Sequence, residues 1–424
     1  MTASLASCEG VPQVGLPPIH LQFGMGDRAP SYAGLIAADE AEAALVARNI
    51  MRAGGNATDA AVALGFALSV TLPSSAGLGG SGACVVHDAV TGTTEALDFT
   101  PRPGTDEGAA RYRAAIPALP RGLFALHAKY AKLPWAQDVA PAENLARFGT
   151  KVSRALAQDL AADGGVLVND RIALTAFMTP RRQVLQAGET IKQADLATML
   201  GRLRAHGAGD LYAEALVDEM VDAFAAAGSV ITGEDLRSYV PRWVVAAGMD
   251  EGPTRLFVLP ADVGGGDFLK TLAARPPRPS DKAVAAGATS FVVADTEGGA
   301  VACALSMGAP FGLGIMPPAT GFLLAPAPDA PGAHPQGLAP VIAVHHADNR
   351  MVFAAAAAGA DAIARTAALT HAAVVERRVG SSAREFDRRS GLVNMLACDL
   401  HEPGCLVQSD QSGAGYAVVL TPKD

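Results

Sequence analysis

Hydrophobic residues recur along this chain with two spacings, one typical of helices and one typical of strands. Apolar positions follow a helical period over Ala37–Ala53, and Gly54-Gly55 ends that run. A second helix is predicted over Asn56–Val70; it is apolar on every side, which is typical of a fully buried helix. Helical spacing also dominates residues 119–227, where Trp135 marks one helix start.

Short runs rich in small and β-branched apolar residues predict strands. In chain order these runs are Ala83–Val86, Thr93–Phe99, Leu256–Leu259, Thr289–Ala294, Ala300–Ser306, Gly321–Leu324, Gly337–Val344, Met351–Ala356 and Gly413–Leu420. A long helix is predicted over Asp361–Arg378, and a proline-rich stretch at Ala274–Ser280 separates two blocks. Because helices and strands are interleaved without strict alternation, the pattern favours an α+β fold in packed layers over a doubly wound sheet.

Composition narrows the class of protein further. Half of the 424 residues are hydrophobic, enough for a large core, whereas residues 1–30 contain several prolines and are predicted to be irregular. The net charge is −9 with no basic stripe, so nucleic acid is not an expected partner. The longest apolar stretches, Ala60–Val70 and Met351–Ala360, are shorter than the ~18–20 residues needed to cross a bilayer. No transmembrane segment is therefore expected.

The cysteines and the N-terminus leave the cellular compartment open. Met1–Ser7 lacks the basic and apolar regions of an intact signal peptide, yet Leu5-Ala6-Ser7-Cys8 is similar to the end of a lipoprotein signal. The five cysteines show no zinc spacing, and we expect no metal and no cofactor. Cys398 and Cys405 are close enough in sequence to form a disulfide, but free thiols are an equal alternative.

The glycine-rich segment Gly77–Gly82 matches a dinucleotide-binding fingerprint by its letters alone. That fingerprint requires a preceding strand and a following helix, because the pyrophosphate sits at the helix N-terminus. Here the predicted order is reversed, with a helix before the glycines and a strand after them. The segment is better interpreted as a tight loop that leads into a core strand.

Three segments, Arg52–Ala63, Pro73–Gly80 and Glu95–Phe99, closely resemble motifs of the gamma-glutamyltranspeptidase family. The resemblance continues through Leu119–Leu123, Tyr130–Trp135, Gly228–Trp243, Gly287–Gly314 and Thr320–Leu324. It implies the four-layer αββα sandwich of N-terminal-nucleophile hydrolases, as a single domain over residues 31–424. Within that domain, residues 31–287 would correspond to the large subunit and residues 288–424 to the small one. It also implies a periplasmic or extracellular protein; the alternative is a cytoplasmic one.

Members of that family are made as precursors that cut themselves before a threonine, which then attacks a γ-glutamyl amide. In this chain the position is Ala288, and a methyl group can neither cut the chain nor form an acyl enzyme. Thr289 is the alternative nucleophile, or Ser290, assisted by Asp295 or a nearby histidine. One step along a strand reverses the side-chain direction, however, which argues against Thr289. The histidines at 345 and 346 are predicted to lie at a hairpin on the surface rather than to bind a metal.

The residues that would bind the substrate also depart from the family pattern. Thr100 stands where the family has a carboxylate-binding arginine, and Arg102 is expected to be a solvated surface side chain. Ser306 keeps a hydroxyl in place of threonine, and Gly308 replaces an asparagine. The remaining positions of this vestigial site are Asp329 and Ala330 in place of the amine-binding acid, Gly337 in place of paired serines, and Gly359-Ala360 in place of two oxyanion-hole glycines.

The sequence therefore predicts a gamma-glutamyltranspeptidase-like pseudoenzyme that stays uncleaved and serves as a binding or structural subunit. It would act with a protein partner or as a homo- or hetero-oligomer, and the sequence does not identify a small-molecule ligand. The alternative is an active γ-glutamyl hydrolase or transferase, or a related amidase, with the relocated nucleophile Thr289.

Overall fold

A computed structural model of the chain describes residues 32–105, 110–213, 216–263, 265–274, 287–333, 337–377, 392–399, 404–410 and 413–422. The predicted irregular segment 1–30, the Leu5–Cys8 motif and the proline-rich stretch after Ala274 lie outside these residues.

The α-helices are α1 (Ala41–Arg52), α2 (Ala57–Thr71), α3 (Leu119–Tyr130), α4 (Trp135–Phe148), α5 (Arg154–Asp163), α6 (Arg171–Phe177), α7 (Ala194–His206), α8 (Gly209–Ala213), α9 (Leu216–Ala226), α10 (Gly233–Ser238), α11 (Gly265–Ala273) and α12 (Ala362–Thr370). The strands are β1 (Gly34–Ala38), β2 (Ser81–Asp88), β3 (Thr93–Phe99), β4 (Thr150–Lys151), β5 (Thr190–Ile191), β6 (Arg242–Val245), β7 (Ala247–Glu251), β8 (Thr254–Val258), β9 (Ala288–Asp295), β10 (Ala300–Ser306), β11 (Val341–His345), β12 (Met351–Ala357), β13 (Val393–Cys398), β14 (Cys405–Gln408) and β15 (Tyr416–Leu420).

Two large antiparallel sheets form the centre of the molecule. The first has seven strands in the order β15-β1-β9-β10-β2-β3-β6, and the second has six in the order β14-β13-β12-β11-β8-β7. Strands β4 and β5 form a separate short pair. Strands far apart in sequence lie side by side, as β1 does between β15 and β9, so the sheets form only when distant parts of the chain come together.

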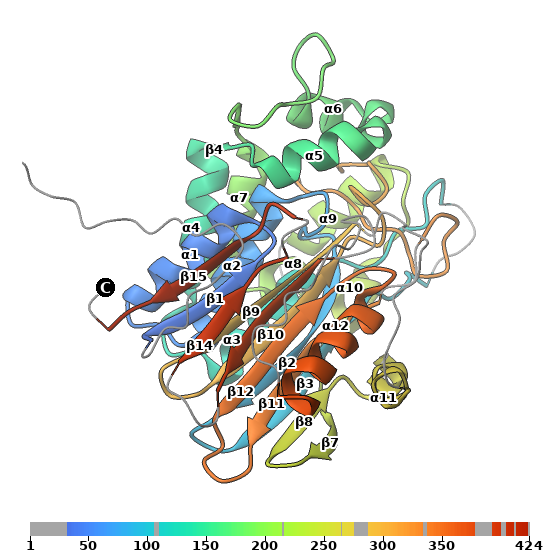
Figure 1. Ribbon diagram of the computed structural model, residues 1–424. Helices are drawn as coiled ribbons and strands as arrows, with labels where there is room; N and C mark the ends of the chain where they lie inside the picture. The colour runs from blue at the N-terminus through green and yellow to red at the C-terminus, as the bar shows by residue number, and fades with distance from the viewer. Residues whose placement is uncertain are drawn as a thin grey trace, which may run out of the picture.

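Three layers of buried apolar side chains hold the sheets and helices together. One layer fills the space between the seven-stranded sheet and helices α1–α4. A second, rich in alanine, lies between the two sheets, and a third lies between the six-stranded sheet and helices α11 and α12. In Figure 1, α1 and α2 cover one side of the sheets and α12 covers the opposite side. The molecule is thus an αββα sandwich, which confirms the predicted α+β fold class.

The predicted central strands, β9 and β10, are adjacent and almost completely buried in the seven-stranded sheet. Alternation divides their side chains between two cores. Phe291 and Val293 contact the helix layer, whereas Val292 and Ala294 face the second sheet. The second sheet lies between these strands and α12, so the two helix layers enclose both sheets as expected.

Helix α2 begins as its sequence predicts. The Asn56 side chain accepts hydrogen bonds from the backbone of Thr58 and Asp59, and the Asp59 carboxylate accepts one from the backbone of Asn56, which completes a capping box. All fifteen residues of α2 are buried. The single helix predicted over Ala37–Ala53 is wrong at its start: β1 extends to Ala38, and α1 begins only at Ala41.

Two further predictions need correction. The run Gly321–Leu324 is not a strand; its one β-pairing is an isolated bridge between Leu324 and Gly79, and Leu324 otherwise bonds to the backbone of Leu313 and Ile315. The helix predicted over Asp361–Arg378 ends earlier, since α12 stops at Thr370 and a single π-helical turn covers His371–Val375. In both segments tertiary packing, rather than the local run of apolar residues, decides the conformation.

The glycine-rich loop has the predicted order, with α2 ending at Thr71 before it and β2 beginning at Ser81 after it. A Cβ atom on Gly79 would lie 2.2 Å from the carbonyl oxygen of Leu323. The glycine therefore permits two backbone segments to approach each other closely, and the loop is not a nucleotide site of the fingerprint type.

Two disulfides join strands that are neighbours in the sheets. Cys398 and Cys405 are directly opposite on β13 and β14 and are bonded, which settles the open alternative in favour of the disulfide. Cys84 and Cys303 are directly opposite on β2 and β10 and form a second disulfide that the sequence analysis missed. Within the described residues, no helix combines the length and apolar character needed to cross a membrane.

Candidate functional site

The sheet registers bring the start of β9 and the end of β10 together. Ala288, the first residue of β9, is directly opposite Ser306, the last residue of β10. Ser306 is in turn opposite Ser81, the first residue of β2. The second sheet meets this end of the first, since the Ser290 hydroxyl donates a 2.8 Å hydrogen bond to the carbonyl of Ala356 near the end of β12. Ala288, Ser306 and Ser81 therefore lie together at one end of the sandwich.

The backbone before Ala288 is held in a fixed conformation. Gly287 has a φ of +52°, and a Cβ atom there would lie 2.0 Å from the backbone of Ala309, so only glycine fits. The carbonyl of Gly287 accepts a 2.8 Å hydrogen bond from Met307. The Ser306 hydroxyl lies 3.4 Å from the same carbonyl and accepts a 2.9 Å bond from Gly308. The methyl of Ala288 packs half-buried against the core between the sheets.

Thr289 is held by a carboxylate that the sequence analysis did not identify. Its hydroxyl donates a 2.9 Å hydrogen bond to Oδ2 of Asp39, just beyond the end of β1. The backbone of Ser290 donates to the same oxygen at 3.0 Å, and Asn394 donates to Oδ1 at 2.7 Å. Burial raises the pKa of Asp39 to about 6, although these hydrogen bonds oppose the rise. Thr289 and Asp39 are only 1% and 3% exposed.

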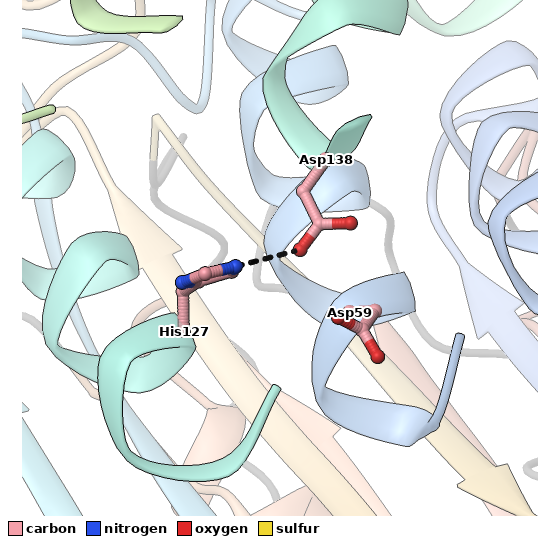
Figure 2. Close-up of side chains that lie close together, drawn as sticks. All are labelled: Asp59, His127 and Asp138. Atoms are coloured by element: carbon pink, nitrogen blue, oxygen red, sulfur yellow. Dashed lines mark ion pairs between the residues drawn. The ribbon is translucent and has the colours of Figure 1, made fainter. Parts of the chain in front are cut away.

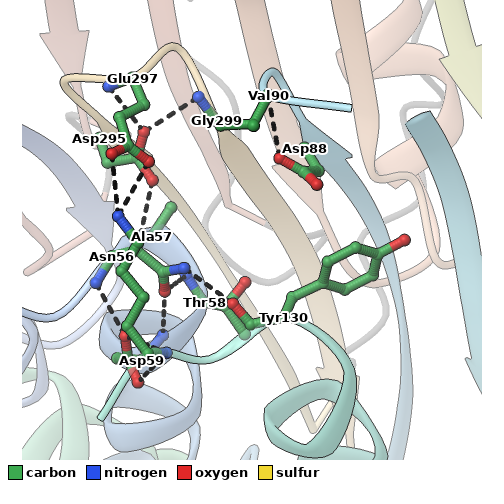
Figure 3. Close-up of polar contacts among 11 residues, drawn as sticks. Asn56, Ala57, Thr58, Asp59, Asp88, Val90, Tyr130, Asp295, Glu297 and Gly299 are labelled. Atoms are coloured by element: carbon green, nitrogen blue, oxygen red, sulfur yellow. Dashed lines mark hydrogen bonds and ion pairs between the residues drawn. The ribbon is translucent and has the colours of Figure 1, made fainter. Parts of the chain in front are cut away.

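Asp295 does not assist Thr289. It is the last residue of β9, at the opposite end of the strand, where it accepts hydrogen bonds from the backbone of Ala57, Glu297 and Gly299 (Figure 3). It thus anchors the start of α2 and the turn between β9 and β10. An open hollow of about 260 Å³ lies beside it, at the end of the sheet away from Ala288.

The side chains of Thr100 and Arg102 contact neighbouring residues rather than an open substrate-binding pocket. The Thr100 hydroxyl donates a 2.6 Å hydrogen bond to Asp98, whose other oxygen accepts from Arg242 at 2.6 and 2.9 Å. Although burial raises the pKa of Asp98, the bonds from Thr100 and Arg242 outweigh it and hold the pKa below its usual value. Arg102 is half-buried, with its guanidinium 5.0 Å from the ring centre of Tyr239, so the expectation of a solvated arginine is wrong.

The other vestigial positions divide between the interior and the surface. Gly337 and Gly359 are joined by a 2.9 Å backbone hydrogen bond where the second sheet ends, and Gly359 is buried. Ala360, the next residue, is exposed. Asp329 is exposed and pairs with Arg113 at 2.7 Å, whereas Ala330 is buried. Asp329 is therefore engaged with an arginine at the surface.

The predicted histidine hairpin is confirmed. His345 ends β11, and its Nδ1 lies 2.9 Å from Asp348 in the turn before β12. His346 is 47% exposed and lies 3.7 Å from Asp250. The two imidazoles have different acidic neighbours, so the adjacent pair does not converge on one ion.

Among the described residues, one cluster offers three possible metal ligands: Asp59, His127 and Asp138 (Figure 2). Burial, and after it the negative charge of Asp59, raises the pKa of Asp138 to about 9. This cluster could not be recognised from the sequence, because its members come from three separate helices and show no ligand spacing. Asp39 and Asn394 were missed for a similar reason, since each lies far along the chain from Thr289.

The strand order and the four layers define the class of protein as an N-terminal-nucleophile hydrolase fold. The family model for gamma-glutamyltranspeptidase matches residues 43–275, and the chain belongs to that family. The glutathione hydrolase proenzyme of Escherichia coli is 32% identical over 223 residues, which cover 49% of this chain and 38% of that protein. The glutathione hydrolase proenzyme of Pseudomonas aeruginosa is 30% identical over 256 residues, covering 56% and 45%. The chain thus spans less than half the length of these curated relatives.

Solved structures show the same fold. A crystal structure of cephalosporin acylase from Bacillus halodurans matches 97% of this chain and 99% of its own, with a TM-score of 0.74 at 18% identity. The Helicobacter pylori gamma-glutamyltranspeptidase matches 60% of this chain and 75% of its own, with a TM-score of 0.51 at 24% identity. At these identities the likeness concerns the fold alone.

Proposed function

We propose that this chain is a gamma-glutamyltranspeptidase-family scaffold that neither cuts itself nor transfers a γ-glutamyl group. The observation that carries this proposal is Ala288, which occupies the position of the family's threonine at the start of β9. Its side chain has no atom that can attack a peptide or an amide, so both self-cleavage and acyl transfer lose their nucleophile. The chain would instead serve as a binding or structural subunit.

The surroundings of Ala288 support the same proposal. A γ-glutamyl substrate carries an α-carboxylate and an α-amine, which need a cation and an anion in the site. Thr100 is neutral and donates to Asp98, and Ala330 offers no charge. Asp329, the nearest acid in sequence, is engaged with Arg113 at the surface. Each missing charge-assisted contact is worth about 1.5–3 kcal/mol, so several together weaken binding by orders of magnitude.

One observation favours a second candidate function, an amidase that uses Thr289. Its hydroxyl lies 2.9 Å from Asp39, and Asn394 orients that carboxylate, which is the order of nucleophile, base and orienting group. The burial of both Thr289 and Asp39 argues against it, since a substrate carbonyl would have to reach a hydroxyl that is 1% exposed. We therefore rank it second.

Release of a chromogenic amine from a γ-glutamyl anilide tests both candidates. The wild type, Ala288→Thr and Thr289→Val should all give no turnover above background. Ala288→Thr restores the hydroxyl but not the charged groups that would bind the substrate's α-carboxylate and α-amine. Thr289→Val removes the alternative nucleophile. Turnover by the wild type that Thr289→Val abolishes would establish the second candidate. Turnover only in Ala288→Thr would show that the chain still has a functional binding site for the γ-glutamyl substrate.

A further inference from the structure

Three helices bring an imidazole and two carboxylates together far from Ala288. Asp59 lies in the first turn of α2, His127 in the last turn of α3, and Asp138 in the first turn of α4. Figure 2 shows the three side chains directed toward one another. Nε2 of His127 is 3.6 Å from Oδ2 of Asp138, and one ligand atom from each residue lies within 4.8 Å of the other two.

The two carboxylates have very different surroundings. Asp59 is completely buried and accepts backbone hydrogen bonds from Asn56 at 2.8 Å, Leu133 at 2.8 Å and Lys132 at 3.1 Å. Asp138 is also completely buried, yet neither of its oxygens has a hydrogen-bond partner among the described residues. The unpartnered carboxylate is directed into the cluster, beside a second acid.

The two side-chain cations nearest to this cluster in sequence, Lys129 and Lys132, are already engaged elsewhere, and Lys129 forms an ion pair with Glu95. The ammonium group of Lys132 lies 2.9 Å from the Glu297 carboxylate, and both side chains are half exposed. A completely buried carboxylate whose nearest side-chain neighbours are an imidazole and a second carboxylate carries a large desolvation cost when it is ionised. A cation held between Asp59 and Asp138 would offset that cost, and His127 places a ring nitrogen at the same point.

We propose that Asp59, His127 and Asp138 bind a divalent transition-metal ion of the zinc type. Carboxylate oxygens and an imidazole nitrogen are common zinc ligands, at about 2.0–2.2 Å from the metal. Tetrahedral bonds of that length place neighbouring ligand atoms roughly 3.3–3.6 Å apart, which matches the 3.6 Å between His127 and Asp138. The backbone donors to Asp59 fix that ligand from behind, as outer groups do in metal sites. This site extends beyond the proposed function and differs from the expectation of no metal.

The proposed ion has a structural role. The site joins α2, α3 and α4 at their termini, next to the anchor that Asp295 provides for the start of α2. The His127 side chain is 14% exposed, whereas Asp59 and Asp138 are completely buried, so the ion enters past the imidazole. Nε2 of His127 lies 3.0 Å from the carbonyl of Leu133, so coordination through Nε2 requires the tautomer in which Nδ1 carries the ring proton.

The competing account is that Asp138 holds a proton and that the site binds no metal. Asp138→Asn separates the two, because an amide resembles the neutral acid in shape yet supplies no anionic ligand. The full chain is stripped with a chelator and titrated with zinc by calorimetry, and with cobalt followed by visible absorption. Asp218→Asn, which alters an exposed aspartate on α9, is the matched control.

We expect the wild type and Asp218→Asn to bind one equivalent of zinc, and cobalt to give the visible bands of a nitrogen- and oxygen-ligated ion. Asp138→Asn and His127→Gln should each bind at least tenfold more weakly, and zinc should raise the unfolding temperature only in the wild type and the control. No binding to the wild type would overturn the proposal. Equal zinc affinity in the wild type and Asp138→Asn would do the same, since it places the ion elsewhere.

Discussion

Asp39 is a buried carboxylate that completes the hydrogen bonding of β9 beyond the last residue of β1. It accepts from the side chain of Thr289, the backbone of Ser290 and the side chain of Asn394. These contacts connect β1, β9 and β13, which are parts of both sheets. Because it lies in the interior, ionising it has a cost that an exposed aspartate does not carry.

The raised pKa of Asp39 predicts a pH dependence of stability. Its pKa is about 6 in the folded chain, against an ordinary value of 3.8, so between these values the folded state binds more protons than the unfolded state. Its contribution is therefore fully present below pH 3.8 and is lost as the pH rises through 6. Between pH 5 and pH 7.5 it should lower the free energy of unfolding by about 1 kcal/mol.

Urea unfolding of the wild type and Asp39→Asn at both pH values measures this effect. The variant should lack this part of the pH dependence, whatever its absolute stability, whereas the exposed control Asp218→Asn should keep the wild-type profile. An unchanged difference between the two pH values in Asp39→Asn would contradict the assignment.

For single residues, the sequence predicted the relative orientation of Ala288 and Thr289 but missed the residue that binds Thr289. Strand alternation placed Ala288 and Thr289 on opposite sides of β9 correctly, because that depends only on local geometry. The partner of Thr289 could not be found in this way, since Asp39 is 250 positions away and meets it only through the pairing of β1 with β9. Asp39 lay within a predicted helix, so the sequence pattern did not place it at the end of a strand.

At the scale of elements, local signals worked where they were strong. The Asn56–Asp59 capping box and the wholly apolar surface of α2 predicted a buried helix at the correct position. The boundary between β1 and α1 was missed, because both are rich in small apolar residues and the helical period continues across Asp39-Glu40. The short strands β6, β7, β13 and β14 were missed because pairing with neighbours, rather than their own composition, stabilises them.

The start of α2 yields the next prediction. The Asn56 side chain accepts from two backbone N–H groups and donates a 2.7 Å hydrogen bond to the carbonyl of Tyr130. Asn56→Ala removes the cap and this link to the end of α3, so it should lower the free energy of unfolding by about 1–2 kcal/mol.

Chemical denaturation provides the measurement, with Asn49→Ala as the control. Asn49 is an exposed residue within α1, and its replacement should change stability by less than about 0.5 kcal/mol. Equal effects of the two substitutions would show that the cap contributes nothing.

At the scale of the whole molecule, the two disulfides act over very different lengths of chain. Cys84 and Cys303 are separated by 219 positions, whereas Cys398 and Cys405 are separated by seven. Disulfides persist in oxidising compartments, so both favour the periplasmic or extracellular location over a reducing cytoplasm. The longer bridge also joins the part of the chain before Ala288 to the part after it.

Loop closure predicts that the longer bridge stabilises the fold more. In the chain-entropy account a closed loop of that length contributes about 5 kcal/mol, and a seven-residue loop about 2 kcal/mol. Unfolding of Cys84→Ala/Cys303→Ala should therefore require markedly less denaturant than unfolding of Cys398→Ala/Cys405→Ala. If removing the Cys84–Cys303 disulfide lowered stability less than removing the Cys398–Cys405 disulfide, the prediction would be wrong.

The central claim is that the chain remains one polypeptide through Gly287-Ala288, and its intact mass tests this most directly. The sample must be denatured and fully reduced, because the Cys84–Cys303 disulfide would hold two cut fragments together. Our account predicts one species with the mass of the uncut chain. Two species, with a new N-terminus at Ala288 or Thr289, would show that the chain cuts itself and would contradict the account.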